Sequence, residues 1–223
     1  LGETAHACMP TILQAFLGRP DDTPAGDAFE RRLYVCRRTI EKKADAEFAL
    51  RDKIFYVCSM SSRTIVYKGM LVATQMRRFF IDLNDAAVKT AVALVHSRYS
   101  TNTTPSWERA HPNRFIIHNG EINTLKGNVN WIRAREPNLY SPVLQHDLER
   151  VMPIINREGS DSAILDNVLE FLVMNGRPLT RAASMLLPEP WDHNDSLSEE
   201  RRAYDAYQSM LCLLYTSPSP RDC

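Results

Sequence analysis

Apolar residues recur at helical spacing in four segments of the chain. Residues 28–43 carry apolar side chains at intervals of four, three and four positions: Phe29, Leu33, Cys36 and Ile40. Residues 159–176 show the clearest pattern, with Ser160 and Asp161 at an N-cap position and Gly176 at a C-cap position. Their apolar positions are Ile164, Leu165, Val168, Leu169 and Leu172. Residues 178–191 predict a short helix ended by proline, and residues 122–136 an irregular helix weakened by Gly127.

β-Rich runs occupy the first and middle parts of the chain. Residues 53–60 and 63–70 are separated by two serines, which predicts a hairpin. Residues 77–83 are expected to form another strand or an edge segment. Residues 90–100 begin as an apolar run typical of a strand buried on both faces, and residues 114–118 resume strand character. Because helices flank these runs, the pattern predicts an α+β or α/β fold.

Bulk composition narrows the function classes. The 223 residues suffice for one large domain or two small ones, and 44% apolar with 24% charged residues is typical of a soluble globular protein. The formal net charge is zero, which gives no electrostatic reason to expect binding to nucleic acid or to an anionic membrane. No apolar run approaches the roughly 20 residues that cross a bilayer. The N-terminus lacks a secretory signal and begins with Leu1 instead of Met, so we expect a fragment.

The five cysteines lie at scattered positions with no CxxC pair, and no HExxH motif is present. This usage argues against a zinc ribbon or a thioredoxin-like redox site, and no metal site is predicted. It favours a reducing compartment in which Cys8, Cys36 and Cys58 serve as small core residues. The cytoplasm is the expected location, or a plastid if a transit peptide has been lost.

Polar residues gather in three short segments beyond what turns and caps require. They are residues 96–102 (HSRYSTN), residues 118–121 (HNGE) and residues 159–162 (GSDS). The structural alternatives are, in that order, a charged residue that has reached the surface, a hairpin turn and a helix N-cap. Local sequence alone leaves these alternatives open.

The long segment HSRYSTNTTPSWERAHPNRFIIHNGEINTLKGNVNWIRARE, residues 96–136, closely resembles the glutamine amidotransferase domain of glutamate synthase large subunits. GSDSAILD, residues 159–166, fits a later segment of the same family, and the resemblance covers about residues 1–210. Amidotransferases of purine and asparagine synthesis share shorter patterns but not the continuation GNVNW, residues 127–131.

The resemblance implies a four-layer αββα sandwich of the N-terminal-nucleophile hydrolase type and hydrolysis of L-glutamine to glutamate and ammonia. It implies that Arg98 binds the substrate α-carboxylate and Asp161 its α-ammonium group. The side-chain amide of Asn119 and the backbone N–H of Gly120 would form the oxyanion hole. The family's nucleophile is an N-terminal cysteine, which precedes the matched segment. We therefore expect the N-terminal part of the domain to be missing and this fragment to be inactive.

In a full-length enzyme, the resemblance implies that synthase domains of the same chain use the ammonia to aminate 2-oxoglutarate reductively. That reaction would use FMN and an iron–sulfur cluster, supplied with electrons by NAD(P)H or ferredoxin, in some cases through a small reductase subunit. No cofactor is expected within this fragment. Residues 1–210 are expected to form a partial amidotransferase domain, and residues 211–223 a non-native or disordered tail. Two alternatives stay open: a glutaminase domain of another amidotransferase, and a non-catalytic module that kept the fold.

Overall fold

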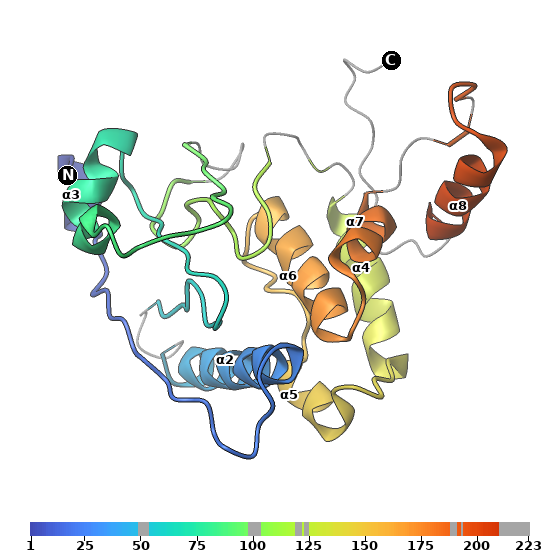
Figure 1. Ribbon diagram of the computed structural model, residues 1–223, viewed down its shortest axis with the longest axis horizontal. Helices are drawn as coiled ribbons and strands as arrows, with labels where there is room; N and C mark the ends of the chain where they lie inside the picture. Colours follow the sequence, from blue (N-terminus) through green and yellow to red (C-terminus); the bar gives the residue numbers. More distant parts are fainter. Residues whose placement is uncertain are drawn as a thin grey trace. The chain divides into compact units, whose positions relative to one another are not determined.

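A computed structural model describes residues 1–48, 54–97, 104–118, 122, 125–187, 191–192 and 194–209. The chain divides into two compact units, Leu1–His118 and Asn119–Cys223. The first unit contains α1 Glu3–Ala7, α2 Asp27–Phe48, η2 Ala73–Gln75, α3 Met76–Phe79 and η3 Ile81–Asn84 (Figure 1). The second contains α4 Leu125–Arg135, η4 Glu136–Asn138, η5 Gln145–Asp147, α5 Leu148–Val151, α6 Asp161–Met174, α7 Leu179–Leu186 and α8 Glu199–Ser209.

The helix predicted at residues 28–43 is confirmed as α2, but its buried face differs from the prediction. Phe29 and Leu33 are buried as expected, whereas Cys36 and Ile40 are exposed. Arg37 is instead only 1% exposed. A guanidinium group can be buried when a carboxylate compensates its charge, and Glu41, one helical turn further along, does so. The spacing of apolar residues therefore predicted a buried face that is shifted by about one position from the observed one, which includes the Arg37–Glu41 ion pair.

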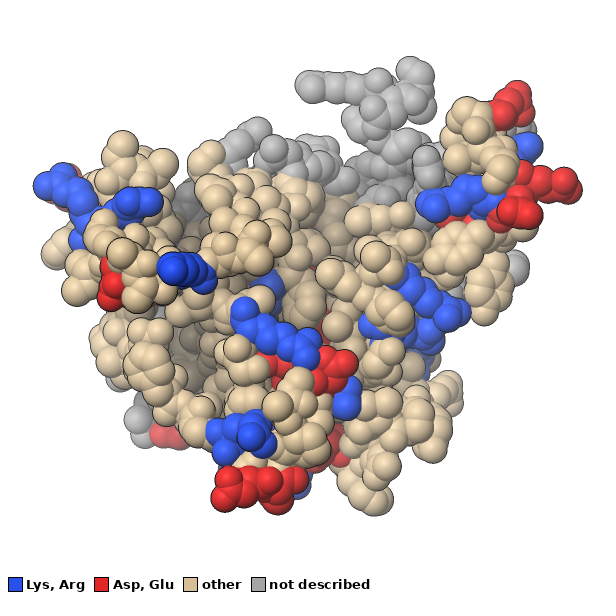
Figure 2. Space-filling view, in the orientation of Figure 1, with Lys and Arg blue, Asp and Glu red and all other residues tan. Residues whose placement is uncertain are grey.

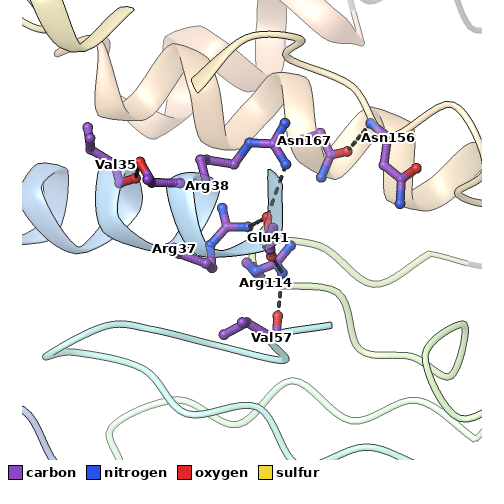
Figure 3. Close-up of polar contacts among 9 residues, drawn as sticks. Val35, Arg37, Arg38, Glu41, Val57, Arg114, Asn156 and Asn167 are labelled. Carbon is purple, nitrogen blue, oxygen red and sulfur yellow. Dashed lines mark hydrogen bonds and ion pairs between the residues drawn. The ribbon is translucent and has the colours of Figure 1, made fainter. Parts of the chain in front are cut away.

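Glu41 accepts hydrogen bonds from three arginines (Figure 3). Arg37 Nη1 lies 2.8 Å from both carboxylate oxygens, while Arg38 reaches Oε2 at 3.0 Å and Arg114 reaches Oε1 at 3.1 Å. Arg114 also donates to the carbonyl oxygen of Val57. One carboxylate thereby ties α2 to the segments that carry Val57 and Arg114.

The described residues contain no regular β-strand, so the expected sandwich is not confirmed by this structure. Residues 54–60 and 63–70 are described without strand assignment, and so are residues 90–97 and 114–118. The serine corner between the first two runs is held by a side chain of α2. Ser61 Oγ donates to Glu30 Oε2 at 2.7 Å, and the Ser62 backbone N–H donates to Glu30 Oε1 at 2.8 Å. The corner is thus fixed by a buried carboxylate instead of by a strand ladder.

The strand or edge segment predicted at residues 77–83 is wrong, because α3 and η3 occupy these positions. Consecutive side chains of a strand point to opposite faces. Here the ring of Phe79 contacts both Phe80, at a centroid distance of 5.0 Å, and Trp107, at 5.6 Å. The Asn84 side chain then donates to the carbonyl oxygens of Arg77 and Ile81, which closes the two turns. Aromatic packing and this cap override the β-propensity of the segment.

Trp107 forms part of the core of the first unit. Its side chain is 2% exposed, and its indole N–H donates to the carbonyl oxygen of Ala5 at 3.0 Å. The backbone of Gly69 lies so close that a Cβ atom there would clash with the indole ring. A glycine is therefore required at this contact.

In the second unit, the helix predicted at residues 159–176 is confirmed as α6, and all five of its predicted apolar positions are buried. Ser160 is the N-cap and accepts a hydrogen bond from the backbone N–H of Ala163 at 3.2 Å. At the other end, Gly176 has φ +85°, and its N–H donates to Val173 while that of Arg177 donates to Leu172. These two bonds form a Schellman motif.

The remaining helices of this unit agree with the pattern where it made a prediction. The irregular helix at residues 122–136 corresponds to α4 followed by η4, and the short helix at residues 178–191 corresponds to α7. α7 packs on α6 and on α8 (Figure 1). α8 was not predicted. Among the described residues, no helix is both long and apolar enough to span a membrane, and residues 211–223 lie outside them.

Candidate functional site

The three polar segments of the sequence are described to different extents. Arg98, Asn119 and Gly120 lie outside the described residues, so the predicted carboxylate-binding and oxyanion positions carry no geometry here. The flanking residues His96 and His118 are described, and so is the whole segment at residues 159–162.

The structure brings the first two polar segments together. His96 Nε2 lies 3.1 Å from the carbonyl oxygen of His118, across 22 positions of sequence. A carbonyl oxygen has no proton to give, so the imidazole nitrogen must be the donor, and Nε2 carries the proton. The residue two positions before Arg98 is thereby bonded to the residue directly before Asn119.

A third imidazole, that of His111, packs against this contact. Its ring centroid lies 4.4 Å from that of His96 in an edge-to-face arrangement, and 6.1 Å from that of His118. His111 is 7% exposed, whereas His96 and His118 are half-buried. Sequence reasoning did not single out His111, because its spacing to either partner follows no helix or strand period. Only its place inside the family-like segment at residues 96–136 pointed to it.

Asp161, the fourth predicted site residue, opens α6. The N-cap role belongs to its neighbour Ser160, which leaves the Asp161 carboxylate in the first turn of the helix. Its Oδ1 atom accepts hydrogen bonds from the Ser162 backbone N–H at 2.7 Å and from the Ser162 hydroxyl at 3.1 Å. A carboxylate offers about four acceptor positions, so these two bonds orient the group without exhausting it. The helix N-terminus favours its negative charge.

The cysteine expectation needs correction. Cys8 and Cys36 are exposed, so they are not core residues. Cys8 ends α1, where its thiol donates to the carbonyl oxygen of Thr4, and Cys36 lies on the outer face of α2. Cys58 is half-buried, and its burial raises the pKa of the thiol above the ordinary value despite the nearby charges of Lys68 and Arg114. A thiol whose pKa is raised is a poor nucleophile at neutral pH.

Within the described ranges, no group of three or more His, Cys, Asp or Glu side chains is arranged to hold a metal ion. Acidic and basic side chains are interspersed on the face that Figure 2 shows, in keeping with the formal net charge of zero. The described residues of the three polar segments offer imidazole, hydroxyl and carboxylate groups for hydrogen bonding.

Comparison with known proteins gives one consistent result. The family model of class-II glutamine amidotransferases matches residues 1–219. The chain is 48% identical over 219 residues to the glutamate synthase [NADPH] large chain of Bacillus subtilis, covering 98% of this chain and 14% of that protein.

Eukaryotic relatives are nearly as similar. The chain is 45% identical over 221 residues to the glutamate synthase [NADH] of Schizosaccharomyces pombe, covering 95% of this chain and 10% of that protein. It is 41% identical over 215 residues to the chloroplastic ferredoxin-dependent glutamate synthase of rice, Oryza sativa, covering 95% and 13%. The chain thus spans between 10% and 14% of the length of these relatives.

Proposed function

Because the chain belongs to the class-II glutamine amidotransferases, we propose that it forms part of the glutamine-hydrolysing region of a glutamate synthase. The observation that carries the proposal is the match to glutamate synthases over almost the whole chain, at 41% to 48% identity in relatives from a bacterium, a yeast and a plant. The three relatives are named for different electron donors, yet they resemble this region similarly. The choice of donor is therefore not encoded strongly in these residues.

The proposed reaction splits L-glutamine and water into glutamate and ammonia through a γ-glutamyl thioester. A cysteine thiolate adds to the side-chain amide carbon, and the amide oxygen becomes an oxyanion that needs donors already in place. We assign this role to the Asn119 side-chain amide and the Gly120 backbone N–H. Glycine suits the position because its backbone can approach the substrate without a Cβ atom. The exposed Cys8 and Cys36 and the poorly nucleophilic Cys58 are not assigned as the nucleophile.

Two charged groups of the substrate need partners. Arg98 is assigned to the α-carboxylate, because its planar guanidinium can bind both oxygens at once. Asp161 is assigned to the α-ammonium group. Its carboxylate is oriented by Ser162 and retains acceptor capacity, which supports this role.

We further propose that the surrounding glutaminase region is the four-layer αββα sandwich of the family, in the cytoplasm or, for a plant protein, in a plastid. Synthase domains of the same chain would pass the ammonia on to 2-oxoglutarate. They would hold the FMN and the iron–sulfur cluster, and some enzymes would add a small reductase subunit. No step assigned here to the residues of this chain involves those cofactors.

The test uses the full-length protein and measures glutamate release from glutamine together with ammonia. We expect Arg98→Ala to raise KM for glutamine at least about 10-fold, because it removes ground-state binding. Asn119→Ala should lower kcat about 100-fold or more with a much smaller change in KM, because an oxyanion donor acts in the transition state. The matched control is Arg150→Ala, which removes an exposed arginine that forms an ion pair with Asp147.

The alternatives predict different results. A glutaminase region that serves another synthase would release ammonia from glutamine but would not form glutamate from 2-oxoglutarate. A non-catalytic module would release no ammonia from glutamine above that of the Asn119→Ala variant. If Asn119→Ala left kcat unchanged in an active enzyme, the oxyanion assignment would be wrong.

A further inference from the structure

The contact between His96 and the His118 carbonyl has no part in the roles assigned so far. We propose that His96 is a positioning residue that restrains the peptide group leading into Asn119, the residue assigned to the oxyanion hole. The proposal rests on the function proposed above, because it takes the assignment of Asn119 and Gly120 as its starting point. His96 itself touches neither substrate nor reacting atoms in this proposal.

The argument begins with the atom that His96 binds. The carbonyl carbon of His118 is covalently joined to the nitrogen of Asn119, and the six atoms of a peptide group are coplanar. A hydrogen bond of 3.1 Å from His96 Nε2 to this oxygen therefore restrains the plane from which Asn119 departs. Donors of an oxyanion hole are effective only when they are fixed before the charge develops. A restraint directly before the first donor acts on that requirement.

The second step concerns what fixes His96. Its ring lies edge-to-face on the buried ring of His111 at a centroid distance of 4.4 Å. That packing limits rotation of the imidazole, so Nε2 points at the carbonyl and not at water. Nε2 carries its proton both in the neutral tautomer required here and in the imidazolium ion. The hydrogen bond can therefore persist throughout turnover without any transfer of its proton.

The third step concerns the position of His96 in the chain. It stands two residues before Arg98, the residue assigned to the substrate α-carboxylate. One short segment would then bind the α-carboxylate of glutamine through Arg98 and restrain the peptide group before Asn119 through His96. The two halves of the site, 22 positions apart in sequence, would keep a constant spacing. A rate that depends on the placement of reacting groups within a fraction of an ångström needs such a constraint.

The experiment replaces His96 in the full-length protein. His96→Phe keeps a flat ring for His111 to pack against but removes the donor, whereas His96→Gln places an amide N–H near the position of Nε2. We expect His96→Phe to lower kcat for glutamine hydrolysis about 3- to 10-fold, the effect of one net hydrogen bond, with KM for glutamine within twofold. His96→Gln should recover most of that loss. His146→Gln, which changes an exposed histidine, is the matched control.

A double-mutant cycle separates positioning from general weakening of the fold. If His96 acts through Asn119, then His96→Phe should have less than a twofold effect on kcat in an Asn119→Ala background. The proposal is overturned if His96→Phe retains full kcat, if it raises KM as much as it lowers kcat, or if the two substitutions act independently. It is also overturned if His96→Gln is as slow as His96→Phe while both variants keep the wild-type melting temperature.

The two proposals fail in different ways. A full-length protein that releases no ammonia from glutamine contradicts the proposed function, and an Asn119→Ala variant with unchanged kcat contradicts the oxyanion assignment. An Asn119→Ala variant that is slow, beside a His96→Phe variant that is not, contradicts only the positioning role.

Discussion

In the first unit, the carboxylate of Glu41 balances the charges of three arginines. Each of its two carboxylate oxygens accepts hydrogen bonds from two guanidinium groups, and three arginines contribute. Burial by itself would raise the pKa of this carboxyl group, but the charges of Arg37, Arg114 and Arg38 outweigh it, and the net pKa is lowered. The ionised Glu41 carboxylate is therefore favoured more strongly in the folded protein than in the unfolded chain.

We expect Glu41→Gln to lower the free energy of unfolding by about 3 kcal/mol, because it leaves buried guanidinium groups without their counter-charge. Denaturant unfolding at pH 7 measures the effect. Asp147→Asn serves as the control, since it removes an ion pair between exposed side chains and should change stability by less than about 0.5 kcal/mol.

The stability difference between wild type and Glu41→Gln should also depend on pH. Because the folded-state pKa of Glu41 is depressed, its contribution is complete above the unfolded pKa, about 4.3, and is lost as the pH falls through the lower folded-state value. The stability difference between wild type and Glu41→Gln should therefore shrink as the pH falls below about 4. A difference that stays constant from pH 7 down to pH 2 would contradict the assigned charge network.

At the scale of the helices, we expect alanine to have opposite effects on stability at two glycine positions. Gly176 follows α6 with φ +85°, a conformation that strains any residue with a Cβ atom, and its N–H belongs to the Schellman motif. We expect Gly176→Ala to destabilise the protein by about 1 kcal/mol. Gly127 lies within α4, where an added Cβ would meet nothing within 4 Å.

Gly127→Ala should stabilise the protein by up to about 1 kcal/mol, because alanine restricts the unfolded chain and favours the helix. Both variants are compared with wild type by thermal unfolding monitored by the helical signal in circular dichroism. Equal melting temperatures for the two variants would show that the caps and backbone angles described here do not govern these helices.

The helices that sequence predicted well are those whose signals are local. Ser160, the apolar positions of α6 and Gly176 all lie within one 17-residue stretch, and each acts through its own neighbours. The buried face of α2 was misjudged because Arg37 is buried by a partner that apolar spacing ignores. The turns at residues 77–83 were missed because Phe79 packs on Trp107, 28 positions away. Long-range packing of this kind leaves no mark on local periodicity.

For the candidate site too, the sequence indicated residues that lie in local motifs but not the contact between distant segments. The motif at residues 96–136 identified Arg98, Asn119, Gly120 and, with the later segment, Asp161 as candidates, and their roles remain proposals. Of these, Asp161 is described, at the start of α6. The contact between His96 and the His118 carbonyl joins two of the segments that sequence had singled out, but sequence could not reveal the bond itself, because it depends on how two distant segments fold together.

At the scale of the whole molecule, the strand-like run at residues 90–97 stands out. Val92 and Val95 are 73% and 79% exposed. Burying a valine side chain contributes roughly 1.5 to 3 kcal/mol, so such a run gains stability when another surface covers it. If the full-length protein contains the proposed sandwich, this run would be one of its strands, and its backbone N–H groups would be bonded to neighbouring strands.

Hydrogen exchange read out by mass spectrometry tests this expectation. We expect the backbone amides of residues 92–96 to exchange at least about 100-fold more slowly in the full-length protein than in the isolated 223-residue chain. Amides in the middle of α6, which is buried in this structure, provide the internal reference and should be protected in both. Equally fast exchange of residues 92–96 in the two proteins would contradict the sandwich.

The closed ends of α6 bear on the order in which this chain acquires structure. Its first and last turns are closed by hydrogen bonds of Ser160, Gly176 and Arg177, so these capping bonds need no distant residue. Helix formation is limited by its first turn, and short-range contacts form before long-range ones. α6 is consequently suited to form early and to serve as a template. The hydrogen bond between His96 and the His118 carbonyl joins two segments that are distant in sequence, so it would form later in folding.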